Sequence, residues 1–272
     1  LWRFLLHGDG FQLDFPVRRV PLRGGCEQGA RVLGQRFRFV TYNIRKGKGA
    51  SGRRDGSVGH LSEALASHRP DVMLCQEVFH GHEHHLHQSR ELSRVLGLQP
   101  YYEPNRRRRH GHHGNATFTH YPVELMRNHD ITTNPIERRG VLYLRLSLDG
   151  RPLHVFNAHL GLNQPQRLRQ IRRIGEIIAA TCGKGEPVVL AGDFNDWTRR
   201  IDREVIERLG FVNAFGHLKG RETLTWHVRR PVFNLDRVYL RHLSVARAER
   251  LSGEPWNDLS DHFPLWAELE LA

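Results

Sequence analysis

Cysteine is scarce in this chain and follows no recognisable pattern. The 272 residues include three cysteines, Cys26, Cys75 and Cys182, which are widely spaced and form no Cys-x-x-Cys pair. An odd number at such spacings excludes a simple disulfide framework, and the lack of paired cysteines argues against a thiolate zinc site. We therefore expect a reducing compartment, the cytoplasm, for this protein.

The chain also lacks long apolar runs. No stretch approaches the roughly 20 consecutive apolar residues of a transmembrane helix, so no transmembrane segment is predicted. The opening run "LWRFLL" is too short for the apolar core of a signal peptide, although a leader removed before Leu1 stays open. Peripheral association with a membrane is compatible with both observations.

Acidic residues are the third shortage. The chain has 29 Asp and Glu against 41 Lys and Arg, which gives a formal net charge of +12. Such an excess of positive charge favours a polyanionic partner, and nucleic acid, an anionic lipid surface and a phosphorylated substrate all satisfy it. Charge alone does not choose among the three.

Apolar segments in this chain predict an α/β fold with many strands. Because 39% of the residues are hydrophobic, the chain can bury one large core, and a single main domain is expected. Strands are predicted at 37–44, 71–78, 141–148, 152–160, 187–194, 233–240 and 263–271, and helices at 61–69 and about 165–181. The basic segment "NRRRRHGHHGN" (105–115) is predicted to be a flexible loop.

Polar side chains end or interrupt most of these strands. They are Asn43, Glu77, His159, Asp193, Asn195, Asp236, Asp261 and His262. Because apolar strands hold their ends rigidly, polar groups placed there can converge on one pocket. One Asp or Asn at a strand end is more often a turn former or a helix cap, but turns do not explain so many. Such a set of oxygen and imidazole groups without cysteine suits Mg²⁺ or Mn²⁺.

Seven motifs resemble those of the endonuclease/exonuclease/phosphatase superfamily, which includes deoxyribonuclease I, exonuclease III and neutral sphingomyelinase. They are "TYNI" (41–44), "CQEV" (75–78), "HGNATFTHYPV" (113–123), "NAHLG" (157–161), "GDFND" (192–196), "LDRVYL" (235–240) and "SDHFPL" (260–265). The motifs follow the family's order, and "GDFNDW" with "RRGVLY" looks closest to a bacterial branch typified by YbhP.

The resemblance implies a deoxyribonuclease I-like fold, a four-layer α/β/β/α sandwich of two packed, mostly antiparallel sheets flanked by helices. Residues 37–272 would form the catalytic domain, and residues 1–36 would be an N-terminal extension without a counterpart in the family. The active site would lie at one end of the sheets.

The resemblance also implies metal-assisted hydrolysis of a phosphoester. Glu77 would bind the metal ion, with Asn43 and Asp261 beside it. Asp193 would orient or deprotonate the attacking water, and Asn195 would hold that water or a phosphate oxygen. Because an Asp with an ordinary pKa is a weak base, the positioning of Asp193 is expected to matter more than its proton affinity.

Further roles follow from the same resemblance. His262 would contact the phosphate, while Asp236 would accept a hydrogen bond from its other ring nitrogen, which fixes the tautomer and raises the pKa of His262. His159 would protonate the leaving group or stabilise the transition state. Asn115 would bond to the phosphate or to a metal ligand.

Substrate contacts are predicted from a basic run and two tryptophans. The residues are Arg106, Arg107, Arg108, Arg109, Trp197 and Trp226. The arginines would bind substrate phosphates, unless the segment is only a charged loop. Each tryptophan would stack on a base or face a lipid, with a packing role as the alternative.

Together these features predict a monomeric, Mg²⁺- or Mn²⁺-dependent phosphodiesterase whose positive charge favours nucleic acid, so that it would be a DNA endonuclease or exonuclease. A phospholipid or phosphoinositide phosphodiesterase or phosphatase at anionic membranes is the alternative. A non-catalytic nucleic-acid-binding module would lack a metal ligand, and none is missing.

Overall fold

Two β-sheets form the centre of the computed structural model, which describes residues 35–52, 57–83, 87–134, 136–216 and 223–271. The first sheet has six strands in the order β11 (Leu243–Arg250), β12 (Leu265–Leu271), β1 (Arg36–Asn43), β2 (Val72–His80), β4 (Gly111–Thr119) and β3 (Gln99–Arg108). The second has six strands in the order β5 (Val123–Asp130), β6 (Gly140–Leu148), β7 (Arg151–His159), β8 (Val188–Asp193), β10 (Asp236–Arg241) and β9 (Val212–Asn213).

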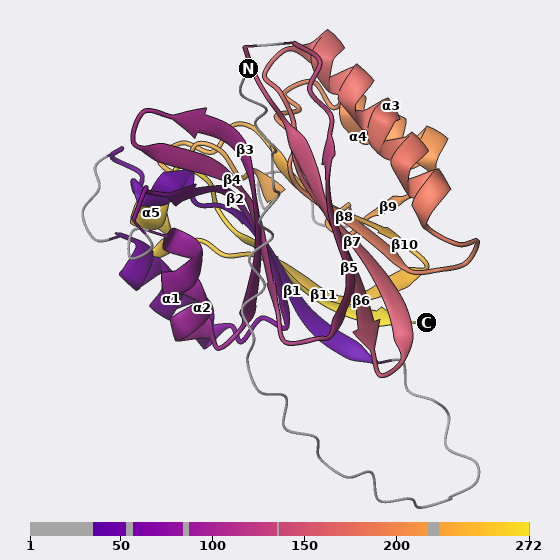
Figure 1. Cartoon of the computed structure of the whole chain (residues 1–272), viewed down its shortest axis with the longest axis horizontal. Helices are drawn as coiled ribbons and strands as arrows, with labels where there is room; N and C mark the ends of the chain where they lie inside the picture. Colours follow the sequence, from indigo (N-terminus) through magenta and orange to yellow (C-terminus); the bar gives the residue numbers. More distant parts are fainter. Residues whose placement is uncertain (1–34, 53–56, 84–86, 135, 217–222, 272) are drawn as a thin grey trace, which may run out of the picture. The chain divides into compact units, whose positions relative to one another are not determined.

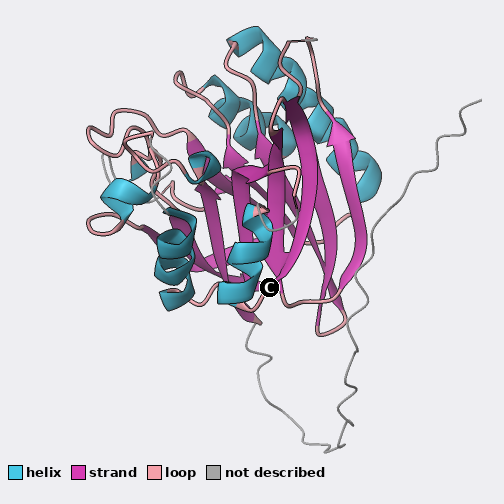
Figure 2. Ribbon diagram, turned by 60° about the vertical axis from the view of Figure 1, so that its left-hand side comes forward, coloured by secondary structure: helices cyan, strands magenta, loops and turns pink. Residues whose placement is uncertain are grey.

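Helices cover the outer face of each sheet (Figures 1 and 2). The first sheet is covered by α1 (Ser57–Ser67), α2 (Gln88–Leu96) and α5 (Trp256–Leu259), and the second by α3 (Gln164–Thr181), α4 (Arg200–Arg203) and the π-helical segment η3 (Glu204–Arg208). The predicted α/β/β/α sandwich is therefore confirmed. Among the described residues, no helix has the length and apolar character to cross a bilayer.

Three apolar cores hold these layers together, one between the sheets and one under each helical layer. Strand β1 shows how one strand serves two of them. Phe37 and Phe39 pack between the sheets, whereas Val40 and Tyr42 pack against the helical side together with Leu61 of α1. Successive side chains of a strand point to opposite faces, so a strand buried on both faces is almost continuously apolar.

The central strand pair of each sheet positions the polar residues. Strand β1 runs parallel to β2, and β7 runs parallel to β8, while the other pairs are antiparallel. Because parallel strands end at the same edge, Asn43 closes β1 near Glu77 of β2, and His159 closes β7 beside Asp193 of β8. Strand β10 begins at this edge with Asp236, opposite Asp193.

The basic segment 105–115 differs from its prediction. It was expected to be a flexible loop, but the structure places most of it in the antiparallel strands β3 and β4, so that prediction is wrong. Strand β3 is one of the two edge strands of its sheet, where prolines and arginines are tolerated because one side needs no partner strand. Except for residues 35 and 36, the predicted N-terminal extension lies outside the described residues.

Candidate active site

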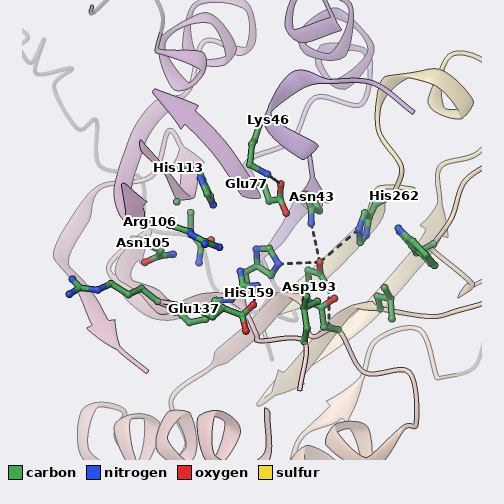
Figure 3. A pocket seen from close by; sticks show the side chains of 18 of the residues that line it. Asn43, Lys46, Glu77, Asn105, Arg106, His113, Glu137, His159, Asp193 and His262 are labelled. Atoms are coloured by element: carbon green, nitrogen blue, oxygen red, sulfur yellow. Dashed lines mark hydrogen bonds and ion pairs between the residues drawn. The ribbon is translucent and has the colours of Figure 1, made fainter. Parts of the chain in front are cut away.

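A pocket of about 320 Å³ opens where the two central strand pairs end (Figure 3). The predicted residues that line it include Asn43, Glu77, Asn115, His159, Asp193, Asn195 and His262. They come from both sheets, so the pocket depends on the packing of one sheet against the other. Asp236 lies behind His262 and is not part of the lining.

Asp193 lies at the centre of this group, with 2% of its surface exposed. Its Oδ2 accepts a hydrogen bond from Nδ2 of Asn43 at 2.9 Å, and its Oδ1 accepts one from the backbone N–H of Asn195 at 2.9 Å. The Nε2 atoms of His159 and His262 lie 3.5 and 3.8 Å from the same Oδ2. Two imidazoles, one at the end of β7 and one in the segment before β12, therefore converge on one carboxylate.

The two histidines differ in charge. Burial opposes the charged form of His262, but Asp236 and Asp193 outweigh it and raise the pKa of His262 to about 10. Its Nδ1 lies 2.8 Å from Oδ2 of Asp236, as the predicted pair requires. Burial lowers the pKa of His159 well below its usual value, and the nearby charge of Arg139 adds to this effect. At neutral pH the site thus holds one cationic and one neutral imidazole.

The carboxylate between them is also perturbed. Burial raises the pKa of Asp193 to about 6, the charge of His262 acts against the rise, and the charge of Asp236 adds to it. The expectation of an ordinary pKa for Asp193 is therefore wrong. A carboxylate whose pKa lies closer to neutral pH is a better general base than an exposed one.

Glu77 projects into the pocket from an irregular point of β2. The pairing of β2 with β4 shifts between Cys75 and Val78, and Glu77 has a positive φ of 57°. A β-bulge redirects the side chain of the bulged residue, which is how Glu77 reaches the pocket. Its carboxylate forms an ion pair with the ammonium group of Lys46. Burial opposes ionisation, yet Lys46 outweighs it and lowers the pKa of Glu77.

Lys46 is a lining residue that the sequence did not indicate. It belongs to the turn η1 (Arg45–Gly47) after β1, in which all three residues have positive φ values of 47°, 59° and 64°. The side chain of Arg45 stabilises this turn through an ion pair of 3.3 Å with Asp261. The Asp261 carboxylate also accepts a hydrogen bond from Nε1 of Trp226 at 3.4 Å. The structure places Asp261, a predicted metal ligand, outside the pocket lining.

Oxygen ligands for a divalent cation are available in the pocket. Asn115 donates its Nδ2 hydrogens to the carbonyls of Gly140 and Asn157 at 3.3 and 3.0 Å, so its Oδ1 faces away from them. Within the described part of the chain, this buried Oδ1 has no hydrogen-bond partner. An unpaired buried oxygen is costly unless water or a cation satisfies it. Together with the Glu77 carboxylate, it fits Mg²⁺, which needs only one or two carboxylates and keeps several waters.

A second group of ligand atoms lies deeper. Asp193, Asp236 and His262 offer three such atoms within 4.8 Å of one another. Because Nδ1 of His262 already lies 2.8 Å from Asp236 and its Nε2 faces Asp193, this group has the arrangement of a hydrogen-bonded chain rather than of a free coordination site. The Glu77 side of the pocket is therefore the better place for a metal ion.

The predicted substrate residues separate into two groups. Arg106, Trp197 and Trp226 line the pocket. Arg107 and Arg109 are exposed and do not line it, and the side chain of Arg108 is not described. Trp197 and Trp226 meet edge to face, with ring centroids 6.0 Å apart.

Sequence reasoning missed four further charged lining residues, namely Lys46, Glu137, Arg138 and Arg139. Lys46 lies in a turn, and the other three lie in the segment between β5 and β6. None of them ends a predicted apolar strand, so the search for polar residues at strand ends, which identified the catalytic group, did not identify these four. The doubled arginine before "GVLY" was the one available signal.

Comparisons with known proteins agree with this geometry. The sequence pattern of the Endonuclease/Exonuclease/phosphatase family matches residues 40–262. The protein YbhP of Escherichia coli strain K12 is 35% identical over 246 residues, which cover 86% of this chain and 96% of YbhP.

Solved structures show the same fold. An endonuclease/exonuclease/phosphatase from Bacteroides vulgatus aligns with a TM-score of 0.74 at 19% identity, over 88% of this chain and 100% of that one. A mannosyl-6-phosphatase from Bacteroides thetaiotaomicron aligns with a TM-score of 0.68 at 19% identity, over 86% of this chain and 99% of that one. As its motifs predicted, the chain belongs to the endonuclease/exonuclease/phosphatase family, whose members are hydrolases that act on phosphoesters.

Proposed function

We propose that this protein is a divalent-metal-dependent phosphodiesterase that acts on nucleic acid. The observation that carries the proposal is the buried Asp193 carboxylate, which lies between a neutral His159 and a cationic His262 in the same pocket as Glu77. Environments that push neighbouring pKa values apart are typical of acid and base chemistry.

Each side chain has a role that its environment supports. Asp193 would orient and deprotonate the attacking water, since burial raises its pKa toward neutral pH. The cationic His262 would bind a non-bridging phosphate oxygen and stabilise the charge that develops there. A neutral His159 is a poor acid at pH 7, so it would stabilise the transition state as a hydrogen-bond donor.

Glu77 would hold the metal ion, with the free Oδ1 of Asn115 and the amide oxygen of Asn43 as further oxygen ligands. Bound Mg²⁺ or Mn²⁺ would supply Lewis-acid neutralisation of the phosphate charge. In the structure, the ammonium group of Lys46 already pairs with Glu77, which indicates that this position stabilises positive charge.

Nucleic acid is supported by charge and by aromatic surface together. The net charge of +12 suits a polyanion, and Arg106 places part of that charge at the pocket. Trp197 and Trp226 line the same pocket and offer a surface against which a base can pack.

An anionic phospholipid substrate is the second candidate, and one observation favours it. Ile136, Leu162 and Val232 are exposed by 80%, 60% and 50%. Leu162 lines the pocket, Ile136 precedes the lining residue Glu137, and Val232 pairs through its backbone with Trp226. Apolar side chains among arginines suit the surface of an anionic membrane.

A panel of substrates tests both candidates. The purified protein would be assayed with Mg²⁺, Mn²⁺ or excess chelator on plasmid DNA, single-stranded DNA, RNA, anionic phospholipid vesicles and bis(4-nitrophenyl) phosphate. Glu77→Gln, prepared in parallel, is the matched control for contaminating nucleases. We expect metal-dependent cleavage of nucleic acid by the wild type alone. Hydrolysis of phospholipid without cleavage of nucleic acid would replace the first candidate with the second.

A further inference from the structure

The catalytic roles leave three arginines of the pocket without a function. Arg106 comes from β3 of the first sheet, whereas Arg138 and Arg139 come from the segment before β6 of the second sheet, and all three line the pocket. In Figure 3, Arg106 and Glu137 lie on the side of His159 away from His262. Arg139 pairs with Glu137, and Arg138 lies between these two residues in the chain, so the surplus cations occupy the half of the pocket beyond the reacting centre.

Arg139 is held rigidly in this half. Its backbone N–H donates to Oγ1 of Thr132 at 3.0 Å, and its carbonyl accepts a hydrogen bond from the N–H of Ile131 at 3.0 Å. Its Nη2 donates to Oε1 of Glu137 at 2.6 Å, and 13% of its side chain is exposed. Its buried Nε has no acceptor among the described residues. A fixed guanidinium with an unused N–H is prepared to bind an additional acceptor.

The charge of this half exceeds what one phosphodiester requires. Three arginines against the single carboxylate of Glu137 leave two positive charges, because an arginine side chain stays protonated. The reacting phosphate already has His262 and the Glu77 metal site as its partners. The remaining charge therefore fits a second anionic group. Phosphate is the best match, because a guanidinium can donate two parallel hydrogen bonds to its oxygens.

We propose that Arg106, Arg138 and Arg139 form a binding site for a second phosphate group, adjacent to the phosphodiester that is cleaved. This inference rests on the proposed function and names its substrate more closely. The substrate is a nucleotide unit of a single strand or a strand end, with its base against Trp197 and Trp226 and its neighbouring phosphate on the arginines. A pocket of about 320 Å³ is at the small end of ligand sites, which suits one such unit rather than a base-paired duplex.

Two nitrophenyl esters that differ by one phosphate test this site. The first is thymidine 5′-(4-nitrophenyl phosphate), and the second carries an additional 3′-phosphate. In the wild type, we expect the additional phosphate to raise kcat/KM roughly 10- to 100-fold, as expected for charge-assisted hydrogen bonds. Arg139→Gln and Arg106→Gln should each remove most of this ratio. Arg169→Gln is the matched control, because Arg169 is exposed on the outer side of α3, and it should keep the ratio.

A binding measurement separates this site from the proposed activity. Calorimetry in excess chelator would compare thymidine 3′,5′-bisphosphate with thymidine 5′-monophosphate. We expect the bisphosphate to bind more tightly to the wild type, and equal dissociation constants would overturn the second-phosphate site. Tighter binding of inositol 1,4-bisphosphate than of the nucleotide would overturn the nucleotide assignment. A bisphosphate preference without cleavage of either ester in any metal would support the site and refute the proposed phosphodiesterase.

Discussion

Replacing Asp236 with asparagine removes one charge from a buried pair while nearly preserving its shape. The Asp236 carboxylate is 1% exposed, and its Oδ2 lies 2.8 Å from Nδ1 of His262, which is 5% exposed. Asp236 is the strongest of the groups that raise the pKa of His262 from 6.5 to about 10. Without that carboxylate, only Asp193 and Asp261 remain to oppose burial, so we expect the pKa of His262 in Asp236→Asn to fall well below about 10.

The stability effect follows from the same pair. Removing one partner of a buried ion pair typically costs roughly 3–5 kcal/mol. For a domain of this size, each kcal/mol corresponds to roughly 2–4 °C in Tm, so Asp236→Asn should lower Tm by roughly 6–20 °C. A group whose pKa is higher in the folded than in the unfolded protein stabilises the fold fully at pH values below its unfolded pKa. This stabilisation is lost as the pH rises through its folded pKa. The difference in Tm should therefore be complete below pH 6.5 and shrink toward pH 10.

Three measurements check this reasoning. NMR titration of the histidine rings in the metal-free protein follows the pKa of His262, thermal unfolding at several pH values follows stability, and a chromogenic phosphodiester follows turnover. Because residues that act as one unit are not additive, His262→Ala with Asp236→Ala should be little worse in turnover than His262→Ala alone. A wild-type His262 that titrates near pH 6.5, or additive losses of turnover, would refute the idea of one unit. Additivity would point to a separate role of Asp236.

Four other perturbations have definite expected outcomes. Glu77→Gln should both weaken Mn²⁺ binding in calorimetry and lower turnover, and full activity of this variant would contradict the assigned metal site. Lys46→Met should strengthen Mn²⁺ binding, because it removes a cation that competes for Glu77. Serine at all of Arg106–Arg109 should weaken DNA binding and reduce its salt dependence by roughly one slope unit for each lost phosphate contact, and an unchanged salt series would show that the segment makes no such contact. Gly192→Ala should strongly destabilise the fold in urea unfolding, since the new Cβ would overlap the carbonyl oxygen of Ala158 and φ is +136°.

Seven of the eight inner strands could be predicted from the sequence, whereas the inner strand β4 and the four edge strands could not. The predicted strands correspond to β1, β2, β6, β7, β8, β10 and β12, which are buried by neighbours on both sides. The edge strands β3, β5, β9 and β11 were all missed. An edge strand keeps one side free of hydrogen-bonded neighbours, so its sequence can carry the prolines and arginines of β3 or the mixed polarity of β11. Its local pattern then resembles a loop.

The same distinction applies to the candidate site. Asn43, His159 and Asp193 were identified because each ends an apolar strand, and this pattern can be recognised along the sequence alone. Lys46 and Arg139 reach the pocket from a turn and from a connecting segment, and only the packing of the two sheets brings them there. Perturbed pKa values, such as that of Asp193, likewise arise from burial and from neighbours distant in the sequence.

Backbone strain in the pocket gives an independent reason to regard it as functional. Lys46, Glu77 and Asn195 line the pocket with positive φ values of 59°, 57° and 49°, a conformation that favours glycine. Such residues typically cost roughly 1–3 kcal/mol each and persist only where the surroundings enforce them. Glycine would relieve that strain, but it would also remove the ammonium group, the carboxylate and the Asn195 Nδ2 that donates to the Leu160 carbonyl at 2.9 Å. The fold therefore retains locally unfavourable backbone at positions whose side chains line the proposed active site.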